Sequence, residues 1–191
     1  MAYTDTFPDD VLDTVATQIG SRLSLPSGER AVEIRETFSV WMLGLDATTK
    51  PEEPIAKLVT KTGRWHHQIS IGSQVRSFAR STPYGPTAAD WSITQVTSDS
   101  PIAEAIDEAI DWVDKNVKDD PLVRLVVIPS YYLHVFWLET EKGSHILVVH
   151  KPDQYIRLKY ETIYSLREFL ELLAQEPHAL GIPLSPPEKT F

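Results

Sequence analysis

The 191-residue chain contains no cysteine. This absence excludes disulfide bonds, thiolate nucleophiles, and zinc or iron–sulfur sites with cysteine ligands. A chain without cysteine suits a reducing compartment, so we expect a soluble protein of the cytoplasm. The first residues have no basic start followed by an apolar stretch, and no apolar run approaches the ~20 residues of a membrane span. The sequence therefore predicts no signal peptide and no membrane partner.

The familiar catalytic and cofactor motifs are absent as well. The chain has no Gly-x-Gly-x-x-Gly, no P-loop, no His-Glu-x-x-His, no Gly-x-Ser-x-Gly and no EF-hand loop. These absences favour a protein without enzymatic activity and predict no cofactor. The formal net charge of −9 opposes binding to phosphate backbones, so we expect no nucleic-acid partner.

Hydrophobic periodicity predicts the secondary structure. Helices are expected over 9–20, over 101–117 with Pro101 at the first position, and after a capping box at Ser165 and Glu168. A turn or two of helix is expected over 55–60. Strands are expected over 36–45, 65–80, 91–96, 122–128, 131–139, 145–150 and 155–160. Segment 36–45 also fits helical spacing, but its β-branched and aromatic residues favour a strand.

Runs of strands with helices between them predict an α+β fold rather than a regular βαβ winding. We expect a mainly antiparallel sheet of about five to seven strands with about two to four helices packed on it. With no internal repeat and no linker, residues 1–191 are predicted to form a single domain. Its N-terminus (1–8) is expected to be flexible, and its Pro-rich C-terminal tail (177–191) extended.

Acidic residues are missing from one long stretch of this acidic protein. The 36 residues from Pro54 to Ala89 contain no Asp or Glu and carry a charge of +5. The cations of this basic segment are Lys57, Lys61, Arg64, Arg76 and Arg80. Either they form a binding surface, or they are internal partners of acidic groups such as those of helix 101–117.

Alternation places Arg76, Phe78 and Arg80 on one face of a strand, just before a turn that contains Tyr84. Guanidinium groups beside an aromatic ring can hold a carboxylate or phosphate. We therefore predict a binding or interaction module that recognises an acidic protein partner or a small anionic ligand through these four residues. The alternative is an enzyme for a small phosphorylated or carboxylated substrate, with Arg76 and Arg80 as its anchor and His66 or His67 as general base.

Histidines are the remaining candidates for a metal site. His66 and His67 point to opposite faces of a strand, so they cannot share an ion. His134 and His150 lie on the two arms of a predicted hairpin. A four-residue loop over 140–143 would pair His134 with residue 149, whereas a bulge at Gly143 would bring His150 opposite His134. Two ligands fall short of the usual three or four, so the sequence predicts no metal.

Two further groups of residues allow a second interpretation. Carboxylates on helix 101–117 can bind a hard cation, but the pattern favours a solvated helix face. Four aromatic residues near strand ends or turns are either interface anchors or core residues. They are Trp41, Trp65, Tyr84 and Trp91.

Overall fold

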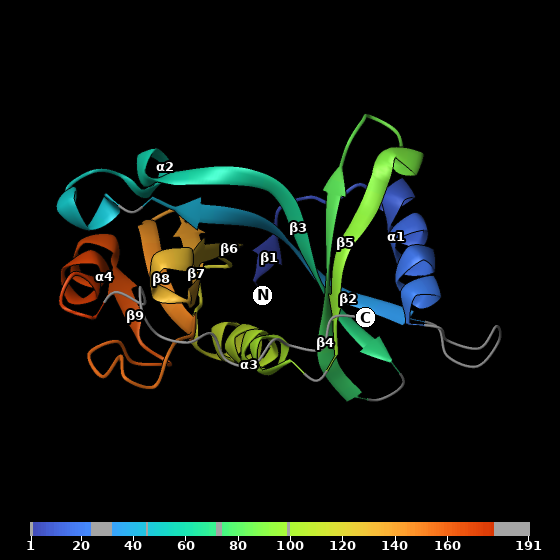
Figure 1. Ribbon diagram of the computed structural model, residues 1–191. Helices are drawn as coiled ribbons and strands as arrows, with labels where there is room; N and C mark the ends of the chain where they lie inside the picture. Colours follow the sequence, from blue (N-terminus) through green and yellow to red (C-terminus); the bar gives the residue numbers. More distant parts are fainter. Residues whose placement is uncertain (1, 24–31, 45, 72–73, 99, 178–191) are drawn as a thin grey trace. The chain divides into compact units, whose positions relative to one another are not determined.

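The computed structural model describes residues 2–23, 32–44, 46–71, 74–98 and 100–177 (Figure 1). Within these residues the chain forms four α-helices and a nine-stranded, mostly antiparallel sheet. The predicted α+β fold with a mainly antiparallel sheet is confirmed. The predicted strand number was too low.

The hydrogen-bonded strand order is β5-β4-β3-β2-β6-β7-β8-β9, and β1 pairs with β6. The strands β2 and β6 are parallel. The strands are β1 (Tyr3–Thr4), β2 (Val32–Leu43), β3 (Val59–Ile71), β4 (Gln74–Pro83), β5 (Trp91–Thr97), β6 (Leu122–Ile128), β7 (Leu133–Thr140), β8 (Gly143–His150) and β9 (Ile163–Ser165). The α-helices are α1 (Asp9–Arg22), α2 (Ile55–Leu58), α3 (Pro101–Asn116) and α4 (Leu166–Leu173).

Two strand predictions were wrong. The segment 65–80 is not one strand but belongs to β3 and β4, which pair antiparallel. Both arms alternate with a period of two, so the alternation alone does not reveal that the chain reverses. The segment 155–160 is not a strand either: Tyr155 N–H donates to Pro152 O in a turn, and Tyr155 and Leu158 are buried at a spacing of three residues.

The contacts divide the chain into two compact units. Among the described residues, unit 1 comprises 2–3, 40–44, 46–62 and 108–177, and unit 2 comprises 4–23, 32–39, 63–71, 74–98 and 100–107. The single domain and the flexible N-terminus stay predictions. The predicted extended tail lies, after residue 177, outside the described residues.

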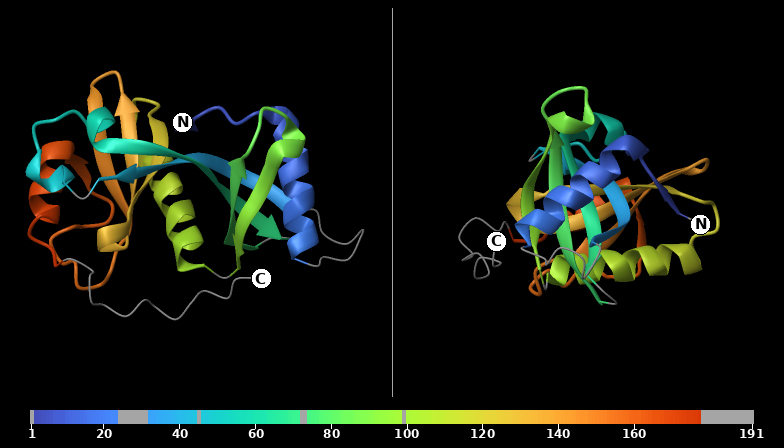
Figure 2. Two further views of the ribbon diagram at one scale, coloured as in Figure 1. Left: turned by 45° about the horizontal axis from the view of Figure 1, so that its top comes forward. Right: turned by 90° about the vertical axis from the view of Figure 1, so that its right-hand side faces the viewer.

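In unit 2, helix α1 packs on one face of an antiparallel sheet (Figure 2). Its residues Val11, Val15 and Ile19 recur every four positions, so they form one apolar stripe, and all three are buried. The sheet side of this core is formed by Trp65, Ile69, Ala79, Trp91, Ile93 and Val96.

The same helix also protects an edge strand. Gln18 donates from Nε2 to Trp91 O at 2.9 Å and accepts at Oε1 from Ile93 N–H at 3.1 Å. Its side-chain amide thus occupies backbone groups of β5 that a further strand would otherwise bind, which limits edge-to-edge association there.

In unit 1, helix α4 packs on the sheet that includes β6, β7 and β8 (Figure 1). The helix contributes Phe169, Leu170 and Leu173 to a core with Val126, Val135 and other strand residues. Of the predicted capping box, the bond from Glu168 N–H to Ser165 Oγ is present at 3.2 Å. No helix in the described part of the chain has the length and apolarity to cross a membrane.

The Ser165 cap makes a testable contribution to stability. Replacement of an N-cap Ser by Ala leaves a helix N–H without its acceptor, so Ser165→Ala should lower the free energy of unfolding by about 1 kcal/mol. Urea unfolding followed by circular dichroism measures this change. Ser165→Asp is the matched control, because it retains an acceptor and should stay close to the wild type; an equal loss in both variants would contradict the cap.

Candidate functional site

The four predicted ligand-binding residues belong to β4 and the segment after it. Phe78 is 1% exposed, Arg80 is half-buried, and Tyr84 is 73% exposed. Arg76 lies in β4, but its side chain is outside the described residues. The cations of the basic segment are divided between the units, with Lys57 and Lys61 in unit 1.

Phe78 is a buried support for Arg80 rather than an exposed ring. The guanidinium carbon of Arg80 lies 5.2 Å from the centroid of the Phe78 ring, within cation–π range. The His66 ring stacks on Phe78 with centroids 4.7 Å apart and an interplanar angle of 23°. Arg80 Nη1 also donates to Gln95 Oε1 at 3.3 Å. These contacts position the guanidinium on the sheet.

Arg80 belongs to a face of the unit 2 sheet that carries mostly polar groups. Cross-strand pairs place His66 and Gln95 directly opposite Arg80, and Ser92 opposite Thr82. Trp65 contributes to the core under α1, so its neighbour Arg64 points to the other side. We call this the polar sheet face; it comprises Arg64, His66, Gln68, Phe78, Arg80, Thr82, Ser92, Gln95 and Thr97.

Exposure varies along the polar sheet face. Gln68 is fully buried, and its Nε2 donates to Ala103 O and to Asp107 Oδ1 of α3, both at 2.7 Å. Arg64, in contrast, is exposed, and Thr82 is half-buried. The accessible part of the face is therefore the part near Arg64 and Thr82.

Thr82 contributes a polar atom that the protein leaves unused. Its Oγ1 is buried and makes no hydrogen bond to any described part of the chain. A buried hydroxyl without a protein partner is uncommon and costs stability, so an ordered water or a bound molecule commonly satisfies it. This atom lies two residues along β4 from Arg80, on the same face.

His66 is held as one specific tautomer. Both partners of Gln68 Nε2 are acceptors, so the amide oxygen of Gln68 faces His66 Nε2 at 2.9 Å. His66 Nε2 must therefore be the protonated nitrogen. Because the ring is 0% exposed and packed on Phe78, it cannot approach a substrate as a general base in this arrangement.

His67 points to the opposite face, as expected for adjacent strand residues. Its Nε2 lies 2.7 Å from Ser81 Oγ, and its Nδ1 lies 3.0 Å from Thr37 Oγ1. This resembles a nucleophile and its base, but His67 and Ser81 are both 0% exposed. Burial lowers the pKa of His67 to about 3, so the ring stays neutral at pH 7. The geometry fits a hydrogen-bonded core.

In unit 1, the β7–β8 hairpin places His134 opposite His150. Thr140 pairs with Gly143, so the hairpin has no bulge at Gly143, which was one of the two arrangements that the sequence left open. The register shifts instead between His134 and Val135, at the other end of the hairpin. The imidazole centroids are 6.0 Å apart. The described residues contain no group of three or more His, Asp or Glu placed to hold a metal ion.

The acidic face of α3 already has partners at several positions. Asp114 Oδ1 accepts from Ala2 N–H at 2.7 Å, and Lys115 lies 3.7 Å from Asp111. Glu104, Glu108, Asp111 and Asp114 are exposed. This arrangement fits a solvated helix face.

Three of the four aromatic interface candidates contribute to cores. Trp65 and Trp91 are each 8% exposed and belong to the core of unit 2. Trp41 is half-buried in unit 1 and packs edge-to-face on Trp137 at 5.6 Å. The sequence did not indicate that Arg124 stacks on Trp137 as well, at 4.4 Å, because these residues come together only through strand pairing.

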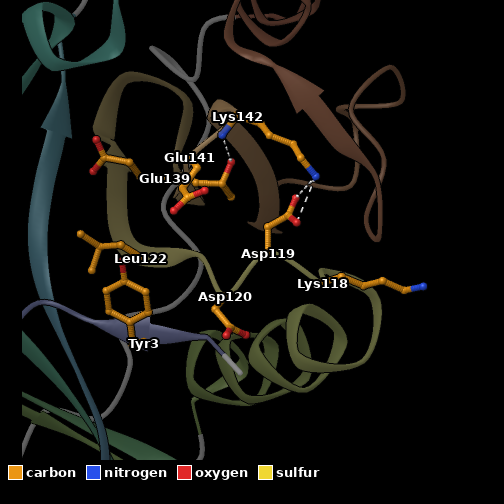
Figure 3. A pocket seen from close by; sticks show the side chains of 9 residues that line it. Tyr3, Lys118, Asp119, Asp120, Leu122, Glu139, Glu141 and Lys142 are labelled. Atoms are coloured by element: carbon orange, nitrogen blue, oxygen red, sulfur yellow. Dashed lines mark hydrogen bonds and ion pairs between the residues drawn. The ribbon is translucent and has the colours of Figure 1, made fainter.

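A surface pocket of about 680 Å³ opens in unit 1 beside the β7–β8 turn (Figure 3). Its charged lining includes both signs, and two of its carboxylates have cationic partners. Lys142 Nζ lies 2.8 Å from Asp119, and Glu139 pairs with Arg124. Four carboxylates and two lysines line the pocket, and this mixture does not define one type of ligand. The pocket is lined by Tyr3, Lys118, Asp119, Asp120, Leu122, Glu139, Thr140, Glu141 and Lys142.

Comparisons of the chain with models of protein families, with curated proteins and with solved structures find no match.

Proposed function

We propose that this protein is a non-enzymatic binding module that recognises anionic groups through the polar sheet face of unit 2. The ligand is a carboxylate or phosphate, presented by an acidic partner protein or by a small molecule. The observation that carries this proposal is that a positioned guanidinium, Arg80, and the buried, unsatisfied hydroxyl of Thr82 lie on the same face of β4.

Two cations of the face are close enough to act on one anion. Arg64 is a diagonal neighbour of Arg80, since His66 lies directly opposite Arg80. Diagonal positions on paired strands are about 7–8 Å apart, a distance that two arginine side chains readily bridge. A carboxylate or phosphate can therefore accept hydrogen bonds from both guanidinium groups. Thr82 Oγ1 is buried, so it donates to the same anion only after neighbouring side chains rotate away from it.

The charge of the surrounding strands supports an anionic ligand. None of β3, β4 and β5 contains an Asp or Glu. The nearest acidic residue along the sheet is Glu36 of β2, which lies on the same face because its neighbour Thr37 bonds to His67 on the other face. Asp107 and Glu33 bond to Gln68 and Ser70, farther along β3. Near Arg64 and Arg80, two cations therefore outnumber the one acid of β2.

Binding is measured by titrating the full-length protein with inorganic phosphate, citrate and an oligoglutamate peptide, monitored by amide NMR shifts. We expect shifts in β3 and β4, and weaker binding at higher salt concentration. The variant Arg64→Gln/Arg80→Gln should reduce the affinity at least about tenfold, because charge-assisted hydrogen bonds are lost.

Arg22→Gln is the matched control. Arg22 is an exposed arginine of unit 2, but it lies on α1, which covers the other face of the sheet. Its loss changes the net charge by one without touching the polar sheet face, so affinity should be retained. An equal loss of affinity in both variants would show that net charge alone causes the effect, and it would refute the site. The absence of NMR shifts with all three probes would refute the site as well.

A further inference from the structure

The bulge in the β7–β8 hairpin determines which residue faces His134. Thr140 pairs with Gly143, and simple counting from that pair would place Val149 opposite His134. Val135 pairs with Val148, but His134 pairs with His150, so β8 has one additional residue at this point. Without it, the two histidines would point to opposite faces of the sheet. Bulges commonly redirect a side chain in this way.

The separation of the two rings suits a shared ion. Zinc–nitrogen bonds of about 2.0–2.1 Å place each imidazole centroid about 3 Å from the ion, so the centroids of two ligands on one ion are about 5 to 6 Å apart. The observed centroids are 6.0 Å apart, with an interplanar angle of 61°. The separation of the rings therefore matches the upper end of the range for two imidazole ligands on one ion.

The surroundings are also suitable. His134 is 8% exposed, and His150 is half-buried, so the pair lies at the border between the core and solvent. The buried His134 shields the space between the two rings from solvent on the core side. His150 is partly exposed, so an ion can reach this space from solvent. Water can supply the remaining ligands on that side.

We propose that His134 and His150 together bind one divalent cation of borderline softness, such as Cu²⁺ or Zn²⁺, between β7 and β8. Neutral imidazole suits these ions and is a poor ligand for Mg²⁺ and Ca²⁺, which take oxygen ligands. With two protein ligands, the order of affinity follows the ordinary preference of nitrogen donors, Cu²⁺ above Zn²⁺.

The test is isothermal titration calorimetry of untagged, full-length protein with Cu²⁺, Zn²⁺ and Mg²⁺. We expect one Cu²⁺ site per chain, weaker Zn²⁺ binding at the same site, and no heat with Mg²⁺. His150→Gln should weaken Cu²⁺ binding at least about tenfold, because one of the two protein–metal bonds is lost. His145→Gln is the matched control, since His145 is a half-buried histidine on the same strand.

A second measurement does not depend on a variant. Long-range ¹⁵N NMR of the imidazole nitrogens in the wild-type protein should show that Zn²⁺ shifts His134 and His150 together, with His145 unchanged. The melting temperature without metal shows whether His150→Gln is folded. Unchanged affinity in folded His150→Gln, shifts confined to other histidines, or no binding of Cu²⁺ and Zn²⁺ by the wild type would each overturn the site.

Discussion

Lowering the pH from 7 to 4 is expected to reduce the free energy of unfolding by about 3 kcal/mol through His67 alone. The pKa of His67 is about 3 in the folded protein, because burial penalises the charged ring, whereas an unfolded histidine has a pKa near 6.5. Between pH 3 and pH 6.5, the unfolded chain therefore binds more protons than the folded protein does. The contribution of neutral His67 to the free energy of unfolding is fully present above pH 6.5, and it is lost as the pH falls toward 3.

The measurement is urea unfolding at pH 7, 5.5 and 4 for the wild type and for His67→Gln. The glutamine cannot be protonated, so the variant should lose about 3 kcal/mol less than the wild type over this range, whatever its stability at pH 7. His145→Gln controls for the removal of a histidine outside this core and should follow the wild type. Parallel pH curves for wild type and His67→Gln would show that His67 is not held neutral.

Local patterns predicted the helices and most strands, because the buried residues of each element recur at regular spacing within one continuous stretch of sequence. Helix 101–117 was evident from its apolar face and its initial proline, and the structure has α3 at Pro101–Asn116. The reversal between β3 and β4 was missed, since alternation continues on both arms of a hairpin. Whether two strands pair is decided by contacts between distant residues, which a local pattern does not contain.

In the candidate site, too, the features set by local sequence were predictable and those set by strand pairing were not. Alternation correctly placed Phe78 and Arg80 on one face, because strand geometry alone determines that relation. The burial of Phe78 under the His66 ring depends on the pairing of β3 with β4, and the sequence did not reveal it. Likewise, the sequence left open whether His134 faces His150, because this depends on a bulge, and the bulge lies between His134 and Val135 rather than at Gly143.

Phe7→Ala is expected to lower the free energy of unfolding by about 3–5 kcal/mol, the usual cost of removing a buried aromatic ring. Phe7 is 8% exposed, and its ring contacts three others edge-to-face: Trp65 at 5.0 Å, Trp91 at 4.9 Å and His67 at 5.1 Å. Such aromatic pairs contribute beyond the area that they bury. Urea unfolding monitored by tryptophan fluorescence reports both the loss and the altered surroundings of the two indoles.

The outcome also decides between two descriptions of the N-terminus. If residues 1–8 are flexible, as the sequence predicts, truncating Phe7 removes few lasting contacts and costs well under 1 kcal/mol. If Phe7 anchors the segment on α1 and the sheet, the cost is several times larger, and Phe7→Leu recovers a good part of it by filling the space. Tyr3→Ala is the matched control: Tyr3 belongs to the same segment but is 54% exposed, so its removal should cost little in either case.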